Sequence, residues 1–215
     1  MIINEIFTAI QGEGKHQGYP VTFVRLSHCT RNCSFCDTPY HNSFEEKTIA
    51  EVEDEIISLG NNTIVFTGGE PLIQFEEIKK LKEQLASVFL FHLETNGDLI
   101  KRGSGIFDKF TQGRITPQEI FDVFDYVCIS PKELKIAKKF GMWGRNPKFD
   151  VKIVTDLNSV GVEMLPYATS LMPLSTYDKK KDSKIRQKVW NYCIDNHLHY
   201  SARLHVQVWG KSKGK

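Results

Sequence analysis

The sequence predicts an α/β fold with mostly parallel strands, arranged as an incomplete, open barrel. Stretches typical of buried strands alternate with amphipathic helical stretches along the chain, which favours βαβ units. About six strands of this alternating pattern are visible, from 21–26 to 168–171, too few for a closed eight-stranded barrel. The unusual motifs of the chain directly follow predicted strands, and parallel sheets carry their functional sites at those carboxyl ends.

The predicted strands cover short runs rich in β-branched, aromatic and other apolar residues. They lie at 2–8, 21–26, 63–67, 88–93, 126–129, 149–154, 168–171 and 203–209. The stretch 98–118 is irregular and resembles a surface insertion.

The predicted helices follow apolar residues at helical spacing. The first covers 49–59, because Thr48-Ile-Ala-Glu51 has the spacing of a capping box and Gly60 can end a helix. The second covers 72–85 and starts beside Pro71, which suits a first helical position. Two more are predicted at 117–124 and 178–197, with the lysines at 179–181 as a solvated helix start.

Length and composition indicate one domain in a reducing compartment. The 215 residues are 40% hydrophobic and carry a formal net charge of +2, so we expect a single domain over 1–215. The sequence has neither an apolar run of roughly 20 residues nor a secretory signal at its start, so we expect a cytoplasmic protein. The bunching of three of the five cysteines argues against a disulfide framework, and we expect Cys128 and Cys193 in the core.

The loop after the strand at 21–26 carries the most specific signal. Cys29, Cys33 and Cys36 form a C-x3-C-x2-C array. Three thiolates from one short loop can hold three irons of a 4Fe-4S cluster and leave the fourth iron open for chemistry. The alternatives are a zinc site completed by a ligand elsewhere, or three unrelated thiols.

Two further features allow both a structural and a functional interpretation. The stretch from Gln11-Gly-Glu-Gly14 to Gly18-Tyr-Pro20 could bring the backbone close to a ligand, although its composition favours an ordinary turn. Arg25 stands in an apolar strand and therefore needs an anionic partner. That partner is either a structural carboxylate or an anionic substrate, and the residues alone do not decide between them.

The cysteine array, followed after the next strand by Gly68-Gly-Glu70, resembles the radical S-adenosylmethionine superfamily. The resemblance implies a (βα)6-type radical SAM barrel with a 4Fe-4S cluster on Cys29, Cys33 and Cys36. It also implies that S-adenosylmethionine chelates the open iron, with the Gly-Gly-Glu backbone and the Glu70 carboxylate at its amino group.

A longer series of motifs is similar to the 7-carboxy-7-deazaguanine synthases of queuosine biosynthesis, the QueE family. The motifs are Glu5-Ile-Phe, Gln11-Gly-Glu-Gly14, Gly18-Tyr-Pro20, Phe23-Val-Arg-Leu26, Cys36-Asp-Thr38, Thr67-Gly-Gly-Glu-Pro71, Glu94-Thr-Asn-Gly97 and Ser130-Pro-Lys132. The resemblance implies a homodimer that converts 6-carboxy-5,6,7,8-tetrahydropterin to the 7-deazapurine with loss of ammonia. A 5′-deoxyadenosyl radical would take hydrogen from the pterin C6, and a flavodoxin or ferredoxin would supply the electron, without direct nucleic-acid or membrane contact.

The same resemblance implies site residues. Ile10, Gln11 and Gly12 would line the pterin, while Arg25 would clamp its carboxylate and Thr67 would hydrogen-bond it. Thr38 would ligate Mg²⁺, a hard cation that suits oxygen ligands. The residues implied to contact S-adenosylmethionine are Phe35, Cys36, Asp37, Gly69, Glu70, Ser130, Pro131, Lys132, Met172, Pro173, Leu174 and Ser175.

Some positions depart from the family pattern, and two rival functions stay open. His28-Cys29-Thr30 stands where the family has Gly-Cys-Asn, and Met172-Pro-Leu-Ser175 where it has Gln-Pro-Met-Asp. No side chain is assigned as a catalytic acid or base. The rivals are an activating enzyme for a glycyl-radical protein and a non-catalytic zinc- or cluster-binding module. The Gln11 loop and Arg25 argue against the activating enzyme, because they suit a small carboxylated substrate.

Overall fold

The computed structural model describes residues 1–33, 36, 43–85, 87–101, 115–141, 146–210 and 212. Within these residues the chain forms nine strands and eight helical segments. The predicted α/β fold, with mostly parallel strands in an open sheet, is confirmed.

In the described part of the chain, none of the helices is both long enough and apolar enough to cross a membrane.

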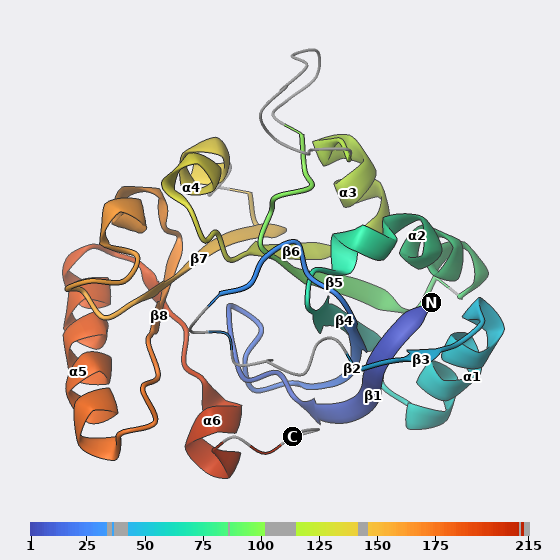
Figure 1. Ribbon diagram of the computed structural model, residues 1–215, viewed down its shortest axis with the longest axis horizontal. Helices are drawn as coiled ribbons and strands as arrows, with labels where there is room; N and C mark the ends of the chain where they lie inside the picture. The colour runs from blue at the N-terminus through green and yellow to red at the C-terminus, as the bar shows by residue number, and fades with distance from the viewer. Residues whose placement is uncertain are drawn as a thin grey trace. The chain divides into compact units, whose positions relative to one another are not determined.

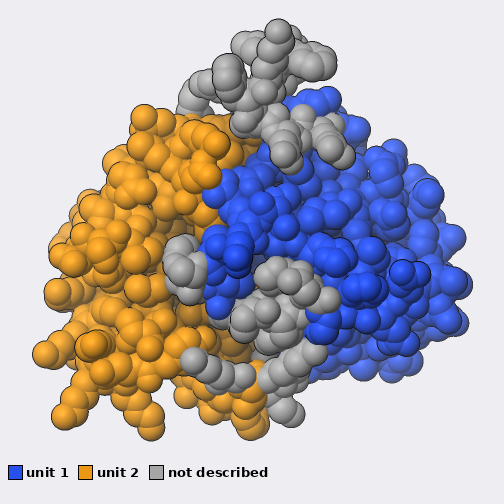
Figure 2. All heavy atoms as spheres, in the orientation of Figure 1, with its two compact units in different colours: residues 1–9, 20–127, 213–215 blue, residues 10–19, 128–212 orange. Residues whose placement is uncertain are grey.

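The chain divides into two compact units, which Figure 2 distinguishes by colour. The first unit is built mainly from residues 1–9 and 20–127. The second unit contains residues 10–19 and 128–212, so the chain enters it twice. The single domain over 1–215 stays a prediction.

The first unit contains the strands that precede the cysteine loop and the Gly-Gly-Glu motif (Figure 1). Its strand order is β3-β1-β2-β4-β5. β2 pairs with β4 and β4 with β5 in parallel, whereas β1 pairs with β3 in antiparallel fashion. The bounds are β1 (Ile2–Ile10), β2 (Pro20–Leu26), β3 (Glu45–Glu46), β4 (Thr63–Gly68) and β5 (Leu90–Thr95).

The helices of the first unit begin where the sequence predicts. At α1 (Ile49–Leu59), Thr48 and Glu51 exchange both capping-box hydrogen bonds, and Gly60 ends the helix at a φ of 75°. The predicted second helix starts as a 3-10 turn, η1 (Pro71–Gln74), and continues as α2 (Phe75–Gln84). A third helix is α3 (Pro117–Val123). The apolar faces of α1 and α2 are buried in the core together with the strands.

The second unit has its own parallel strands, in the order β7-β8-β9. β6 (Tyr126–Ile129) lies where the chain passes from the first unit's residues to the second's. Cys128 and Cys193 are buried, as predicted. The remaining elements are α4 (Leu134–Gly141), β7 (Phe149–Thr155), η2 (Val162–Tyr167), β8 (Ser170–Pro173), α5 (Lys179–Asp195), β9 (His199–Tyr200) and α6 (Leu204–Trp209).

The predicted strand at 203–209 is wrong, because this stretch forms α6. Its alternation of apolar and polar residues suggested a strand, but burial falls steadily toward Trp209 instead of alternating. The amide of Gln207 donates to the carbonyl of Arg203, and that of Gly210 to Val206, as in a helix. The sequence also missed α4 and the two-residue strands β3 and β9. Most of the expected insertion, residues 102–114, lies outside the described residues.

Candidate functional site

Three loops follow the parallel strands β2, β4 and β5 of the first unit. The β2 loop begins at Ser27 and carries the cysteines, the β4 loop carries Gly69 and Glu70, and the β5 loop runs from Asn96 to Asp98. Because the three strands are parallel neighbours, their carboxyl ends and these loops meet at one edge.

Two glycines allow the β2 and β4 loops to touch through their backbones. The amide of Gly69 donates to the carbonyl of Leu26 at 3.1 Å, and that of Glu70 to the carbonyl of His28 at 2.8 Å. A Cβ at Gly69 would lie 1.8 Å from the His28 oxygen, and one at Gly68 would lie 2.0 Å from the Leu26 oxygen. The Gly-Gly pair is therefore required by the approach of the cysteine loop itself.

Glu70 joins the β4 loop to the β5 loop through its buried carboxylate. One oxygen accepts hydrogen bonds from the Thr95 hydroxyl at 2.6 Å and the Leu72 amide at 3.1 Å, and the other accepts from the Asn96 amide at 2.8 Å. Burial raises the pKa of Glu70 to about 7, although these three donors act in the opposite direction. In this structure Glu70 holds two strand-end loops together.

The cysteine loop is also held to the β5 loop. The Arg31 guanidinium forms an ion pair with Asp98, with nitrogen–oxygen distances of 2.6 Å at both contacts. The Thr30 hydroxyl donates to Asp98 at 3.1 Å and accepts from the Asn96 side chain at 3.0 Å. Together with Glu70, these contacts close a ring of hydrogen bonds through all three loops.

The three thiols lie on one loop but do not converge on a point. Among the described residues, no three Cys, His, Asp or Glu side chains are placed to hold a metal ion together. Burial raises the pKa of the Cys29 thiol; the hydrogen bond from the Arg31 amide opposes this, and the charges of Glu70, Cys33 and Cys36 add to it. Cys29 and Cys33 are half-buried and Cys36 is exposed, so an incoming cluster can reach them. This donor set fits a cubane cluster with one iron left open.

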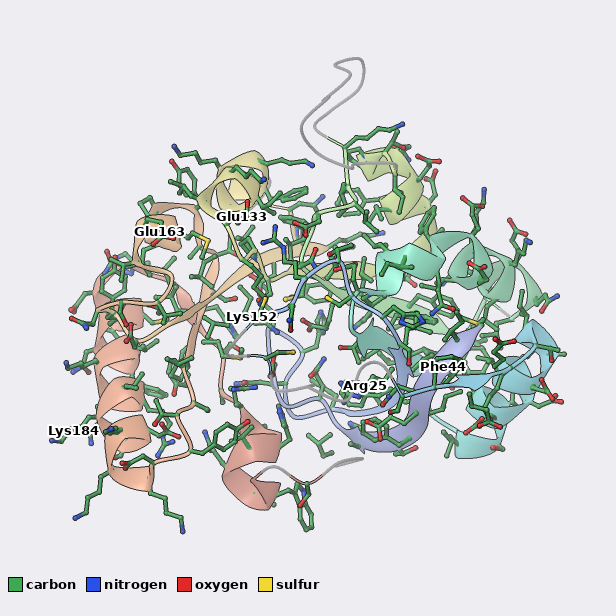
Figure 3. All side chains as sticks on the ribbon, viewed as in Figure 1. Arg25, Phe44, Glu133, Lys152, Glu163 and Lys184 are labelled. Atoms are coloured by element: carbon green, nitrogen blue, oxygen red, sulfur yellow. The ribbon has the colours of Figure 1, made fainter. Side chains whose placement is uncertain are left out.

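His28 takes a backbone conformation that favours glycine. Its φ is 68°, in the left-handed region, and its ring lies 5.5 Å from that of Phe44 between centroids. The resembling family has glycine at this position. The turn that enters the cysteine loop thus has a conformation that glycine adopts most readily, and the His28 ring packs near Phe44, which Figure 3 labels.

Arg25 on β2 and Thr67 on β4 lie side by side, because they are partners in the register of these two parallel strands. The Arg25 Nε donates to Glu5 at 2.7 Å, and the guanidinium carbon lies 5.6 Å from the centre of the Phe7 ring. The structure therefore brings two of the predicted substrate residues together and shows an ion pair to Glu5 at the same time.

In the second unit, the predicted Gln11 and Gly12 lie in a tightly bonded loop. The amide of Gln11 donates to the carbonyl of Tyr19 and its carbonyl accepts from Gly18, both at 2.8 Å. The carbonyl of Gly12 accepts from Leu204 at 3.0 Å, and a Cβ at Gly12 would lie 2.4 Å from the His205 ring. The neighbouring Ile10 is exposed.

Sequence analysis missed the buried charge cluster around Glu13. Its carboxylate pairs with Lys152 at 2.7 Å and Arg203 at 3.3 Å, and lies 3.8 Å from His205. Burial opposes ionisation of Glu13, but these cationic groups hold its pKa well below the usual range. Figure 3 shows Lys152 in the interior, whereas Glu163 and Lys184 lie at the periphery of this unit. The signal in the sequence that could have indicated this cluster is the lysine within the apolar run 149–154.

The remaining predicted cofactor residues of the second unit lie at strand ends. The Lys132 ammonium donates to the Ser130 hydroxyl at 2.9 Å, Pro131 is buried, and Met172, the last residue but one of β8, is 4% exposed. A pocket of about 410 Å³ adjoins the end of β8. Residues of its lining are Pro173, Leu174, Ser175, Asp182, Arg186 and Arg203.

Phe35, Asp37 and Thr38 lie outside the described residues. Their predicted contacts with S-adenosylmethionine and Mg²⁺ stay predictions.

The raised pKa of Glu70 predicts how stability depends on pH. The unfolded chain releases this proton near pH 4.5, whereas the folded protein keeps it until about pH 7. Stability contributed by the retained proton is complete below pH 4.5 and is lost as pH rises through 7. Relative to Glu70→Gln, the wild-type free energy of unfolding should therefore fall by roughly 3 kcal/mol over this range.

Urea unfolding of both proteins at several pH values checks this. The difference between the two curves isolates Glu70, so a general loss of stability in the variant does not matter. Parallel curves would mean that Glu70 is ionised at its ordinary pKa.

Comparisons with known proteins agree with the motifs. Residues 24–127 match the model of the Radical SAM superfamily. A 7-carboxy-7-deazaguanine synthase of Hyperthermus butylicus is 43% identical over 229 residues, covering 95% of this chain and 91% of the relative. The synthase of Haemophilus influenzae is 34% identical over 157 residues, covering 73% of this chain and 64% of the relative.

The fold also has a counterpart among solved structures. The crystal structure of QueE from Escherichia coli superposes with a TM-score of 0.53 at 18% identity, covering 95% of this chain and 94% of that one. The likeness shows the shared fold, and the sequence relatives show the family. This chain belongs to the family of 7-carboxy-7-deazaguanine synthases within the radical SAM superfamily.

Proposed function

We propose that the protein converts 6-carboxy-5,6,7,8-tetrahydropterin to 7-carboxy-7-deazaguanine with release of ammonia. Its relatives, named for this product, supply the activity. The observation that supports this activity for the present chain is the position of Arg25 and Thr67. They are registered neighbours on β2 and β4, the two strands whose loops carry the cysteines and the Gly-Gly-Glu motif.

We propose that Cys29, Cys33 and Cys36 hold a 4Fe-4S cluster whose open iron takes S-adenosylmethionine. When bound, the reduced cluster supplies the electron that generates the 5′-deoxyadenosyl radical. Thr38 would hold Mg²⁺ beside the substrate carboxylate. The protein's own groups bind, orient and shield the reactants, and none is assigned as an acid or base.

Glu70 would serve S-adenosylmethionine through its backbone. Its carboxylate already accepts three hydrogen bonds inside the first unit. We therefore propose that the backbone of Gly69 and Glu70 meets the cofactor's amino group, while the buried Glu70 carboxylate keeps that backbone in place. Other contacts to the cofactor would come from Phe35, Cys36, Asp37, Ser130, Pro131, Lys132 and the 172–175 strand end.

Arg25 would clamp the substrate carboxylate while Glu5 orients the guanidinium. The Glu5 pair uses Nε, and both side chains are partly exposed, at 16% and 14%. A guanidinium carries five N–H donors in a planar fork, so the same side chain can pair with Glu5 through Nε and with a substrate carboxylate through other donors. Thr67, Ile10, Gln11 and Gly12 would complete the pterin site.

The partners proposed for this protein are those that the family resemblance implies. We propose a homodimer in the cytoplasm that receives its electron from a flavodoxin or ferredoxin. The near-neutral chain, at +2 formal charge, contains no extended basic block that would indicate nucleic-acid binding.

Anaerobic incubation with the carboxytetrahydropterin, S-adenosylmethionine and a reductant tests the activity. We expect the ultraviolet absorbance of the deazapurine to appear with stoichiometric ammonia. Cleavage of S-adenosylmethionine without any deazapurine would contradict the substrate assignment and favour a different radical enzyme. Omitting the pterin provides the baseline of uncoupled cleavage.

Arg25→Ala should lose pterin turnover by at least about a hundredfold while reductive cleavage of S-adenosylmethionine continues, because a charge-paired anchor of the substrate is removed. Product formation and 5′-deoxyadenosine are measured in the same anaerobic reaction.

Glu5→Gln is the matched variant, since it breaks the same ion pair but leaves the guanidinium in place. We expect it to keep most of the turnover. Equal losses in the two variants would assign Arg25 a structural role only.

A further inference from the structure

We infer that Asp98 is a positioning residue for the cysteine loop and acts through its ion pair with Arg31. The inference rests on the proposed function only in that this loop holds an iron–sulfur cluster. Asp98 lies on the β5 loop, outside every predicted set of site residues, and its described hydrogen bonds go to Thr30, Arg31 and Asn96.

The geometry of the pair fixes the middle of the loop. Arg31 lies between Cys29 and Cys33 in the sequence. Its Nε and Nη2 each donate to a separate oxygen of Asp98 at 2.6 Å, and both side chains are only 17% exposed. Such a two-pronged pair sets the orientation of both planar groups, unlike a single exposed contact.

The Asp98 side of the pair is itself anchored. The amide of Asp98 donates to the Asn96 side chain at 2.9 Å, and the amide of Asn96 donates to the buried Glu70 carboxylate at 2.8 Å. The Thr30 hydroxyl bridges Asp98 and Asn96 from the cysteine loop. Asp98 is therefore an anchored partner that can hold Arg31 and, with it, the described part of the cysteine loop.

The ion pair also affects a hydrogen bond to a cysteine sulfur. The backbone amide of Arg31 lies 3.4 Å from the Cys29 Sγ and donates to it. Amide hydrogen bonds to cluster sulfurs stabilise the more negative, reduced cluster and so raise its reduction potential. Loss of the two-pronged contact with Asp98 would loosen the Arg31 side chain and let this amide move, so Asp98 should affect both cluster retention and cluster potential.

Three variants separate this role from general stability. Asp98→Asn keeps the side-chain shape but loses the charge and one acceptor, and Asp98→Ala removes the pair entirely. Glu55→Gln is the control, because it removes a carboxylate that forms an ion pair elsewhere in the same unit: Glu55, on α1, lies 3.0 Å from the Lys47 ammonium. Each protein is reconstituted anaerobically with iron and sulfide. We then measure iron loss to a ferrous chelator and the cluster potential by EPR-monitored titration.

We expect Asp98→Asn to lose iron about tenfold faster than the wild type, and Asp98→Ala faster still, which is typical of groups that orient metal ligands. The potential should become more negative in both, and Glu55→Gln should match the wild type. The reduction potential is measured on the fraction of protein that retains a cluster. This measurement therefore tests the inference even if a variant folds poorly.

The outcomes distinguish two failures. A wild-type protein that takes up no iron and sulfide would overturn the proposed function and this inference together. A wild type with a cluster, and Asp98 variants that match it in iron loss and potential, would overturn the inference alone.

Discussion

The buried carboxylate of Glu70 is the interaction on which the edge of the first unit depends. It is fully buried and accepts hydrogen bonds from the β5 loop and the start of η1, while its own amide binds the β2 loop. A buried carboxyl group is costly unless its oxygens are satisfied, so these contacts must form together. The glycines beside it let the loops approach closely enough for this to happen. The cysteine loop is thus part of a closed structure and is not a free appendage.

In the second unit, charged partners stabilise the carboxylate of Glu13. Glu13 is held among Lys152, Arg203 and His205, which keep its pKa low, whereas uncharged donors leave that of Glu70 raised to about 7. Removing one partner of a buried pair leaves an uncompensated charge, so the Glu13 cluster constrains the loop at 10–19 strongly. Each unit therefore fixes its predicted ligand-binding loop through a carboxylate. Glu70 is fully buried and has a pKa of about 7, whereas Glu13 is half-buried and its pKa is held low.

The sequence predicted what depends on local pattern. The capping box at Thr48, the strands of the parallel sheet and the buried cysteines at 128 and 193 follow from short-range rules, and all are confirmed. The strand predicted at 203–209 is wrong because the alternation of apolar and polar residues there resembles that of a strand, whereas tertiary contacts favour a helix. The partners of Glu13, Glu70 and Asp98 could not be predicted, because they come from residues far apart in the chain. The family motifs named several site residues, but not the contacts that hold them.

We propose that the three cysteines of this loop hold a cluster with one open iron. Iron, zinc and acid-labile sulfide analysis of the anaerobically reconstituted protein tests it most directly. The account predicts about four irons and about four sulfides per chain, with no zinc, and a spectrum that changes when S-adenosylmethionine binds. A single zinc ion without sulfide would contradict it.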